Sequence, residues 1–295
     1  EQASNRDGGA GGRGGSGGSD GGPLFAQSTA GTDPQAIDED LAAFADDSYD
    51  YDPDAEGDDL PEGWRRATDE DLARLGLDEG DLVDGDSGFQ AGVYIDEDGN
   101  VVLAFAGTRD TDDWLANLEQ GAGLDTRQYS QALEVATRLR DAVGDDLVIT
   151  GHSLGGGLAS YAALGTGNPA VTFNASGLSD GSLERLGYSP GDARAAASDG
   201  LVRAYRMESD ILTYVQEEKL PTRGLAPDAV GTPITLRDTA PVPSTWGVDI
   251  PFTDTRVGFD PLTTTGHGGD MHSLGAVREA LANDQPWNTT GSGGR

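Results

Sequence analysis

The sequence predicts an α/β fold in which a mostly parallel central sheet carries helices on both faces. The apolar run at residues 147–151 leads through GHSLG into a small-residue segment, as a strand followed by a helix does. From residue 88 onward, segments of period two alternate with segments of helical period. A chain of 295 residues is also long enough to bury a substantial core.

Composition excludes several classes of partner and chemistry. With 52 acidic and 19 basic residues, the net charge of −33 argues against nucleic acid as a partner. Because cysteine is absent, there is no disulfide, thiolate metal site or cysteine nucleophile. No apolar run reaches the length of about 18 residues that a transmembrane helix needs. We expect neither a metal nor a cofactor.

Glycine-rich segments lie at both ends of the sequence. Residues 1–22 consist largely of glycine and serine, which predicts a flexible linker, and residues 289–295 predict a flexible tail. We therefore expect one folded domain over residues 23–288, taken from a longer, multidomain protein.

The acidic N-terminal part contains signals of a first helix. Asp33 fits an N-cap and Pro34 the first helical position, after which Ile37, Leu41 and Phe44 share one face. The run DDSYDYDPDAEGDD that follows predicts a solvated loop, with calcium binding as a minor alternative.

Capping residues, turn residues and hydrophobic periodicity predict the elements that follow. Thr68 and Asp71 form a capping box that opens a short helix, which Gly76 ends. GFQAGVYI and NVVLAFAG flank DEDG, which predicts a hairpin with its turn at Asp98–Gly99. The DEDGN turn resembles the start of a calcium loop but lacks the later bidentate acid. The remaining elements are helices at 128–143, about 154–165 and about 273–282, and strands at 147–151, 170–175 and 201–207.

A candidate nucleophile lies at the turn after strand 147–151. Gly151-His152-Ser153-Leu154-Gly155 is G-x-S-x-G between a strand and a helix, an arrangement that raises the serine hydroxyl above the sheet edge. The following helix directs its N–H groups toward the place where an oxyanion would form. A glycine-rich turn without chemistry is the alternative.

A reactive serine needs a base, and the sequence offers only His152, His267 and His272. His152 is adjacent to Ser153 and cannot reach its hydroxyl in the needed geometry. The other two follow the last strand, where a base belongs in this fold. We favour His272 because it opens an amphipathic helix, whereas His267 lies between glycines; for either one, a solvated surface residue is the alternative.

The base in turn needs an acid that holds its tautomer. Asp210 follows strand 201–207 and is our first choice. Asp180, after the preceding strand, is second, and for any single aspartate the alternative is plain surface charge.

Oxyanion donors are expected from two turns. Gly107 and Thr108 close a strand, so the N–H and hydroxyl of Thr108, together with the Leu154 N–H, are candidates to bind the developing negative charge. A turn residue without this role is the alternative for Thr108.

LAFAGTRDTDDWLANL followed by ITGHSLGGGLAS resembles the class 3 lipases, serine ester hydrolases related to fungal triacylglycerol lipases and bacterial phospholipase A1 domains. The resemblance spans roughly residues 85–280. It implies an α/β-hydrolase fold, a triad of Ser153, Asp210 and His272, and oxyanion donors at Thr108 and Leu154. The family often has arginine before Gly-Thr; Ala106 stands there in this sequence, so no role is assigned to it.

In that family a mobile lid often follows the oxyanion turn. Residues 111–124 place Trp114, Leu115 and Leu118 on one helical face, which suits either a lid that meets acyl chains or a core-packing helix. Residues 212–262, with Trp246 and Phe252, have no assigned role.

We therefore expect a serine ester hydrolase that cleaves acyl esters of glycerolipids, most simply a phospholipase A1 acting as a secreted or delivered bacterial effector. Its expected partners are membrane phospholipid or another lipid ester, met by transient surface contact, and a cognate inhibitor protein if it is a toxin. The alternatives are a triacylglycerol lipase, a small-ester esterase, or an inactive hydrolase scaffold used as a binding module.

Overall fold

The computed structural model describes residues 24–55, 57, 59–108, 126–216, 227–238, 248–249, 256–257 and 271–288. Within this part of the chain, an eight-stranded sheet runs in the order β1-β3-β4-β5-β6-β7-β8, with β2 paired to β3. β4 to β8 are parallel to one another, whereas β1, β2 and β4 pair with β3 in the antiparallel sense. The strands are β1 (Trp64–Arg66), β2 (Val83–Asp84), β3 (Phe89–Asp96), β4 (Val101–Phe105), β5 (Leu147–His152), β6 (Ala170–Phe173), β7 (Val202–Met207) and β8 (Thr232–Leu236). A separate pair joins β9 (Val248–Asp249) and β10 (Arg256–Val257).

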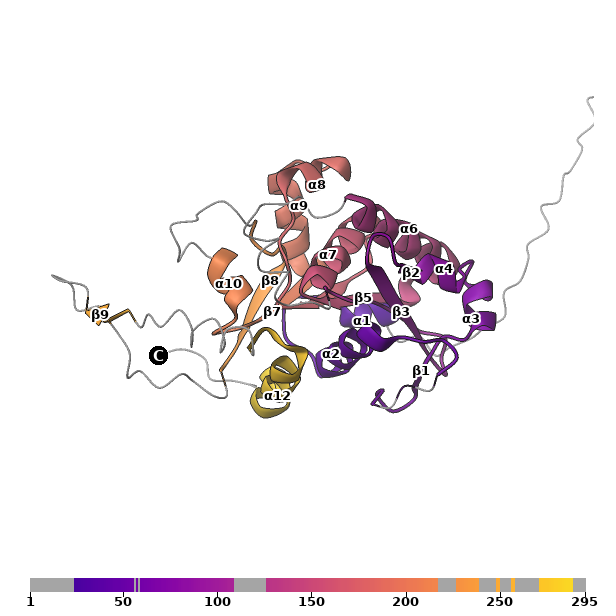
Figure 1. The fold of residues 1–295 in the computed structure, drawn as a ribbon, viewed down its shortest axis with the longest axis horizontal. Coiled ribbons are helices and arrows are strands. Elements are labelled where there is room, and N and C mark those ends of the chain that lie inside the picture. The colour runs from indigo at the N-terminus through magenta and orange to yellow at the C-terminus, as the bar shows by residue number, and fades with distance from the viewer. Residues whose placement is uncertain are drawn as a thin grey trace, which may run out of the picture.

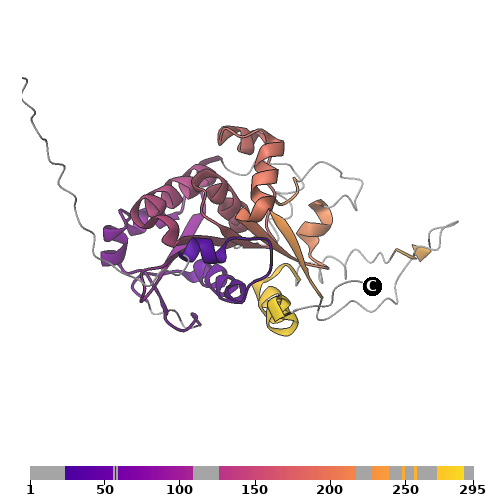
Figure 2. The ribbon, with the colours of Figure 1, turned by 180° about the vertical axis from the view of Figure 1, so that it is seen from behind.

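Helices cover both faces of this sheet (Figure 1). α1, α2 and α12 lie on one face, and α6 and α7 on the other, an arrangement that the view from behind also shows (Figure 2). The helices are α1 (Phe25–Thr29), α2 (Ile37–Asp47), α3 (Asp69–Arg74), α4 (Glu79–Leu82), α6 (Thr126–Val143), α7 (Leu154–Thr166), α8 (Asp180–Arg185), α9 (Pro190–Ala196), α10 (Ile211–Gln216) and α12 (Leu274–Asp284). Short turns of other helical types cover η1 (Ser48–Asp50), η2 (Gly144–Asp146), η3 (Ala197–Leu201) and η4 (Pro286–Asn288). The predicted α/β-hydrolase architecture is confirmed.

β5 lies in the middle of the sheet and is buried along its whole length. Its neighbours β4 and β6 are equally buried, as expected for parallel strands covered on both faces. Because parallel strands end at one edge, the segments after β4, β5, β6 and β7 meet there. Those segments begin with Ala106, Ser153, Asn174 and Glu208.

At a predicted helix start and a predicted hairpin turn, the expected capping residues and glycines are found in place. Thr68 and Asp71 form a complete capping box at α3, and Gly76 ends that region with φ +79°. In the β3–β4 hairpin, Gly99 has φ +88°, and the Asp96 carboxylate accepts from the amides of Asp98 and Asn100. Asp96, the first acid of DEDGN, thus caps the turn.

Two expectations about the N-terminal part were wrong. α2 begins at Ile37 and not at Asp33–Pro34, because the Asp38 carboxylate accepts from the Gln35 amide and so caps the chain just before Ile37. The acidic run is also not simply a solvated loop. Tyr51 within it is buried and donates a hydrogen bond to the carbonyl of Ala67.

A buried ion pair ties α2 to the sheet. Arg203 of β7 binds the carboxylate of Asp38, both side chains being almost fully buried, and Tyr205 donates to the same carboxylate at 2.7 Å. Removing one partner of such a pair leaves an uncompensated buried charge, which typically costs about 3–5 kcal/mol.

No helix within the described ranges has the length and apolarity needed to cross a bilayer.

Candidate active site

Ser153 lies at a sharp turn between β5 and α7, with φ 57° and ψ −124°. This backbone conformation is rare for a residue with a side chain and marks stored strain. Neighbouring backbone groups hold it: the Ser153 amide donates to the Phe173 carbonyl at 3.0 Å, and the Ser176 amide donates to the Ser153 carbonyl at 2.9 Å. The turn is therefore fixed from β6 as well as from its own strand.

The two glycines of the G-x-S-x-G motif are required by close backbone approach. A β-carbon at Gly151 would collide with the carbonyl of Gly155. One at Gly155 would collide with the carbonyl of Phe105, the last residue of β4. The motif thus packs the start of α7 against the ends of two strands.

Hydrogen bonds connect Ser153, His272 and Asp210 in series. The Nε2 atom of His272 lies 2.9 Å from Ser153 Oγ, and its Nδ1 atom lies 2.7 Å from Asp210 Oδ1. All three side chains are buried, although they come from three separate segments. An Nδ1–H donated to Asp210 leaves Nε2 free to accept the serine proton, which is the tautomer that a general base needs.

Local structure positions the acid and the base. Asp210 sits in the turn between β7 and α10, where its Oδ2 accepts from the Thr213 amide at 2.7 Å. His272 directly precedes Ser273, whose side chain caps α12 by accepting from the Ala276 amide. The acid and the base are thus each placed at the start of a helix.

The expected oxyanion donors flank Ser153. A β-carbon built on Gly107 would lie 3.1 Å from Ser153 Cβ and 2.9 Å from the His152 carbonyl oxygen, so the turn after β4 packs on the elbow. Thr108 follows and is exposed, and Leu154 is the first residue of α7. The turn that carries Thr108 and the start of α7 therefore both lie next to Ser153.

The structure does not bring the other candidates to this site. Asp180 is exposed and pairs with Arg194 at 2.8 Å. His267 and the expected lid at 111–124 lie outside the described residues, as do Trp246 and Phe252. No group of three or more metal-ligating side chains occurs in the described part of the chain.

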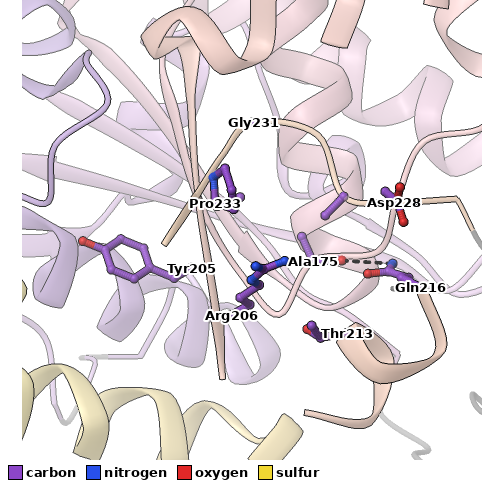
Figure 3. Close-up of a pocket in the computed structure, with 10 residues that line it drawn as sticks. Ala175, Tyr205, Arg206, Thr213, Gln216, Asp228, Gly231 and Pro233 are labelled. Atoms are coloured by element: carbon purple, nitrogen blue, oxygen red, sulfur yellow. Dashed lines mark hydrogen bonds between the residues drawn. The ribbon is translucent and has the colours of Figure 1, made fainter. Parts of the chain in front are cut away.

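A cavity of about 400 Å³ lies between residues of β7, α10 and β8 (Figure 3). Gln216 reaches across it and donates to the Ala175 carbonyl at 3.3 Å (Figure 3). Neither Ser153 nor His272 belongs to its described lining, so it is separate from the serine. The lining consists of Ala175, Ala204, Tyr205, Arg206, Thr213, Gln216, Asp228, Ala229, Gly231 and Pro233.

Tyr49 and Asn174 also border the site and were not predicted from the sequence, and His152, rejected there as the base, binds both Tyr49 and His272. Asn174, like His152, binds the main chain of His272. Tyr49 lies in the run that we took for a solvated loop. A usable signal existed for Asn174, an asparagine directly after a strand, since asparagine tolerates the positive φ of 43° that it adopts there.

Comparison with known protein families assigns the chain to one of them. Residues 40–241 match the model of a phospholipase-like family described as a Tle-like phospholipase domain. The chain belongs to this family. The match covers the elbow, the oxyanion turn and Asp210 of this phospholipase-like chain, and ends before His272.

A curated relative supports the same assignment. The phospholipase-like chain is 43% identical over 228 residues to a protein named extracellular phospholipase A1 from Serratia liquefaciens. The alignment covers 76% of this chain and 66% of the relative, just under two thirds of its length. Among solved structures, M37 lipase matches with a TM-score of 0.37 at 13% identity, covering 66% of this chain and 76% of the lipase. A similarity that low adds nothing to the fold assignment.

Proposed function

We propose that the protein is a serine ester hydrolase that cleaves acyl esters of glycerolipids, as a phospholipase A1. In this proposal Ser153 is the nucleophile, His272 the general base and Asp210 the residue that orients the base. The amides of Thr108 and Leu154 stabilise the oxyanion. The observation that carries the proposal is the hydrogen-bond series Ser153–His272–Asp210 at an elbow of strained backbone.

Acylation begins when His272 Nε2 takes the proton of Ser153 Oγ while the oxygen attacks the ester carbonyl carbon. The carbonyl oxygen becomes an oxyanion next to the N-terminus of α7, whose dipole and free amides favour negative charge. Collapse of this intermediate breaks the ester bond, and His272 passes its proton to the leaving alkoxide. The products are a lysolipid alcohol and an acyl-Ser153 ester.

Deacylation repeats the sequence with water. His272 removes a proton from the water as it attacks the acyl carbonyl, and returns that proton to Ser153 Oγ. The fatty acid is then released, and the Asp210 carboxylate stabilises the imidazolium in both halves of the reaction. The two halves together consume one ester and one water and return Ser153 and His272 to their starting protonation states.

Two observations favour phospholipid over other esters. The matched family is phospholipase-like, and the relative from Serratia liquefaciens is named a phospholipase A1. A phospholipid with different acyl chains at its two glycerol positions tests this choice directly. We expect the chain of the first position to be released; release of the other chain, or hydrolysis of triacylglycerol alone, would contradict the assignment.

Substitution of the nucleophile tests the mechanism. We expect Ser153→Ala to lower turnover by a factor on the order of 10⁶, because the nucleophile is lost, and to abolish labelling by a fluorophosphonate. Ser160→Ala is the matched control, since Ser160 lies on the same helix, is buried, and binds only the Gly156 carbonyl. More than a tenth of wild-type activity in Ser153→Ala would refute the assignment.

The base is tested by comparing two histidines. We expect His272→Ala to be as damaging as the serine change, because Nε2 contacts Ser153 Oγ. His267→Ala is expected to be mild. The opposite ranking in a p-nitrophenyl ester assay, with both variants folded by circular dichroism, would transfer the role to His267.

We also propose that the protein acts outside the cell that makes it, as a secreted effector on membrane phospholipid. The word extracellular in the name of the relative supports this location. Production of wild type and Ser153→Ala in the periplasm of a bacterial host tests it. Growth arrest with wild type alone is expected, and a cognate inhibitor protein would be sought by its rescue of that arrest.

A further inference from the structure

A second chain of hydrogen bonds runs behind the Ser153–His272 pair. The hydroxyl of Tyr49 lies 2.9 Å from His152 Nδ1, and His152 Nε2 lies 2.6 Å from the carbonyl oxygen of His272. The two imidazole rings are close, with centroids 4.8 Å apart. His152 thus turns its ring away from the hydroxyl of its neighbour Ser153 and toward the main chain of the base.

The direction of each bond follows from the partners. A carbonyl oxygen only accepts, so His152 Nε2 must carry the proton that is donated to His272. Nδ1 of the neutral ring is then an acceptor, and Tyr49 must donate to it. The Tyr49 oxygen in turn accepts from the amide of Gly107 in the oxyanion turn. Every donor and acceptor in this series of hydrogen bonds has a partner only when His152 is neutral.

The surroundings of His152 keep it neutral. Burial, reinforced by the neighbouring His272, lowers the pKa of His152 to about 3. At any pH at which the enzyme is folded and active, its ring is therefore a fixed donor on one side and a fixed acceptor on the other.

The His272 carbonyl has a second donor. Asn174 Nδ2 lies 3.2 Å from this oxygen and 3.1 Å from the Met271 carbonyl oxygen. Asn174 Oδ1 accepts from the Met207 amide at 2.9 Å, at the end of the strand that leads to Asp210. The main chain of the base is thereby held from the ends of β5 and β6.

This arrangement links the two halves of the catalytic site. The Gly107 turn, which carries Thr108, is tied through Tyr49 and His152 to the residue that supplies the base. The distance between the Gly107 turn and His272 is therefore set by buried hydrogen bonds. A misplacement of about 1 Å in such a geometry can cost a factor of 10² in rate.

We propose that His152 is a positioning residue for the reaction: held by Tyr49, its neutral ring fixes the main chain of His272 and couples the base to the oxyanion turn. Asn174 supplies the second attachment. His152 contacts none of the reacting atoms in this scheme. The proposal rests on the proposed roles of Ser153 and His272.

Three variants test it through kcat and KM on a soluble p-nitrophenyl ester. We expect His152→Leu to lower kcat about tenfold or more with KM nearly unchanged, the size of one lost buried hydrogen bond. His152→Gln retains a donor and an acceptor, so it should recover to within about threefold of wild type. Tyr49→Phe should lower kcat about threefold to tenfold. Tyr51→Phe is the matched control, since its hydroxyl binds the main chain of Ala67 and Val93 and neither histidine.

A spectroscopic measurement supplies a readout that packing alone would not move. With ¹⁵N-labelled histidine, we expect the His152 signals of wild type to report the Nε2–H tautomer and not to titrate between pH 5 and 8. In Tyr49→Phe the Nδ1 signal should shift because that nitrogen loses its donor, while Nε2 keeps its proton because the His272 carbonyl still requires it. An Nδ1–H tautomer in wild type, titration of His152 near its ordinary pKa, or full kcat in a folded His152→Leu would overturn the proposal.

The two proposals fail differently. If Ser153 of wild type resists fluorophosphonate and no ester is cleaved, the proposed function is wrong whatever the tautomer of His152. If Ser153 reacts and the His152 variants keep full kcat, only the positioning role is wrong.

Discussion

At the scale of single residues, two histidines a few ångströms apart have opposite requirements. In the proposed mechanism His272 gains and loses a proton in each half-reaction, whereas His152 holds one proton on Nε2 throughout. Asp210 faces the first ring, and a tyrosine hydroxyl and a carbonyl face the second. A carboxylate stabilises an imidazolium, but a hydroxyl donor to Nδ1 excludes it. The hydrogen-bond partners therefore suit the two rings to these different proposed roles.

This difference predicts how stability depends on pH. The pKa of His152 is about 3 in the folded protein and about 6.5 when unfolded, so between these values only the unfolded chain binds the proton. The free energy of unfolding therefore contains a contribution that is complete above pH 6.5 and is lost on acidification. From pH 7 to pH 5 this single group accounts for a loss of about 2 kcal/mol.

Urea unfolding of wild type and His152→Gln at both pH values measures the effect. We expect the free energy of unfolding to fall by about 2 kcal/mol more in wild type than in the variant. The acidic residues, Tyr49 and His272 are present in both proteins and largely cancel in the difference. Equal acid sensitivity would mean that His152 titrates normally in the folded state.

The sequence predicted the three candidate catalytic residues better than the residues that hold them in place. Ser153, His272 and Asp210 were chosen from motif, chain order and position after a strand, and the structure brings all three together. Tyr49 could not be found in this way, and the local signal for Asn174, an asparagine directly after a strand, does not indicate what its side chain binds. Their importance lies in contacts with segments more than 90 residues away, and no local pattern records such contacts.

At the scale of elements, the β5–α7 junction determines whether the site can form. Gly155 touches the end of β4, so the first turn of α7 is held against the strand that leads to the oxyanion turn. The nucleophile and the Thr108 turn are therefore placed by one contact between two elements.

We expect Gly155→Ala to lower the free energy of unfolding by about 3 kcal/mol, because the new methyl group must displace the Phe105 carbonyl. Turnover should fall as well, since the same displacement moves Thr108. Gly181→Ala on α8 is the control: its β-carbon would meet open space, so stability should change little. Thermal melts and p-nitrophenyl ester assays of both variants make the comparison. A Gly155→Ala protein as stable and active as wild type would show that the approach of α7 to β4 is not required.

Helices and strands were predicted correctly where hydrophobic periodicity and the capping or turn residues indicated the same bounds. The strand at 147–151, the helix at 128–143 and the hairpin at Asp98–Gly99 appear close to their expected bounds. The start of α2 was misplaced because Asp38, and not Asp33, supplies the carboxylate that caps the chain before the helix, by accepting from the Gln35 amide. β1 and β2 have three and two residues, too few to show a period, so their pairing with β3 is visible only in the fold.

At the scale of the whole molecule, charge and proposed substrate are in tension. The net charge of −33 gives the protein a repulsive field toward an anionic lipid surface. A phospholipase must nevertheless reach the ester groups of such a surface. Contact must therefore depend on apolar groups and on the screening of charge by salt.

This repulsion predicts that the protein prefers neutral membranes at low salt and that added salt abolishes the preference. We expect faster hydrolysis of zwitterionic phosphatidylcholine vesicles than of vesicles containing phosphatidylglycerol at about 10 mM salt, where the screening length is about 30 Å. At about 150 mM salt the screening length falls to about 8 Å, so the two rates should converge. A soluble short-chain ester, measured in parallel, should show little of this dependence because it carries no surface charge. Faster hydrolysis of the anionic vesicles at low salt would contradict the argument, since it would require a local attraction stronger than the field of the whole molecule.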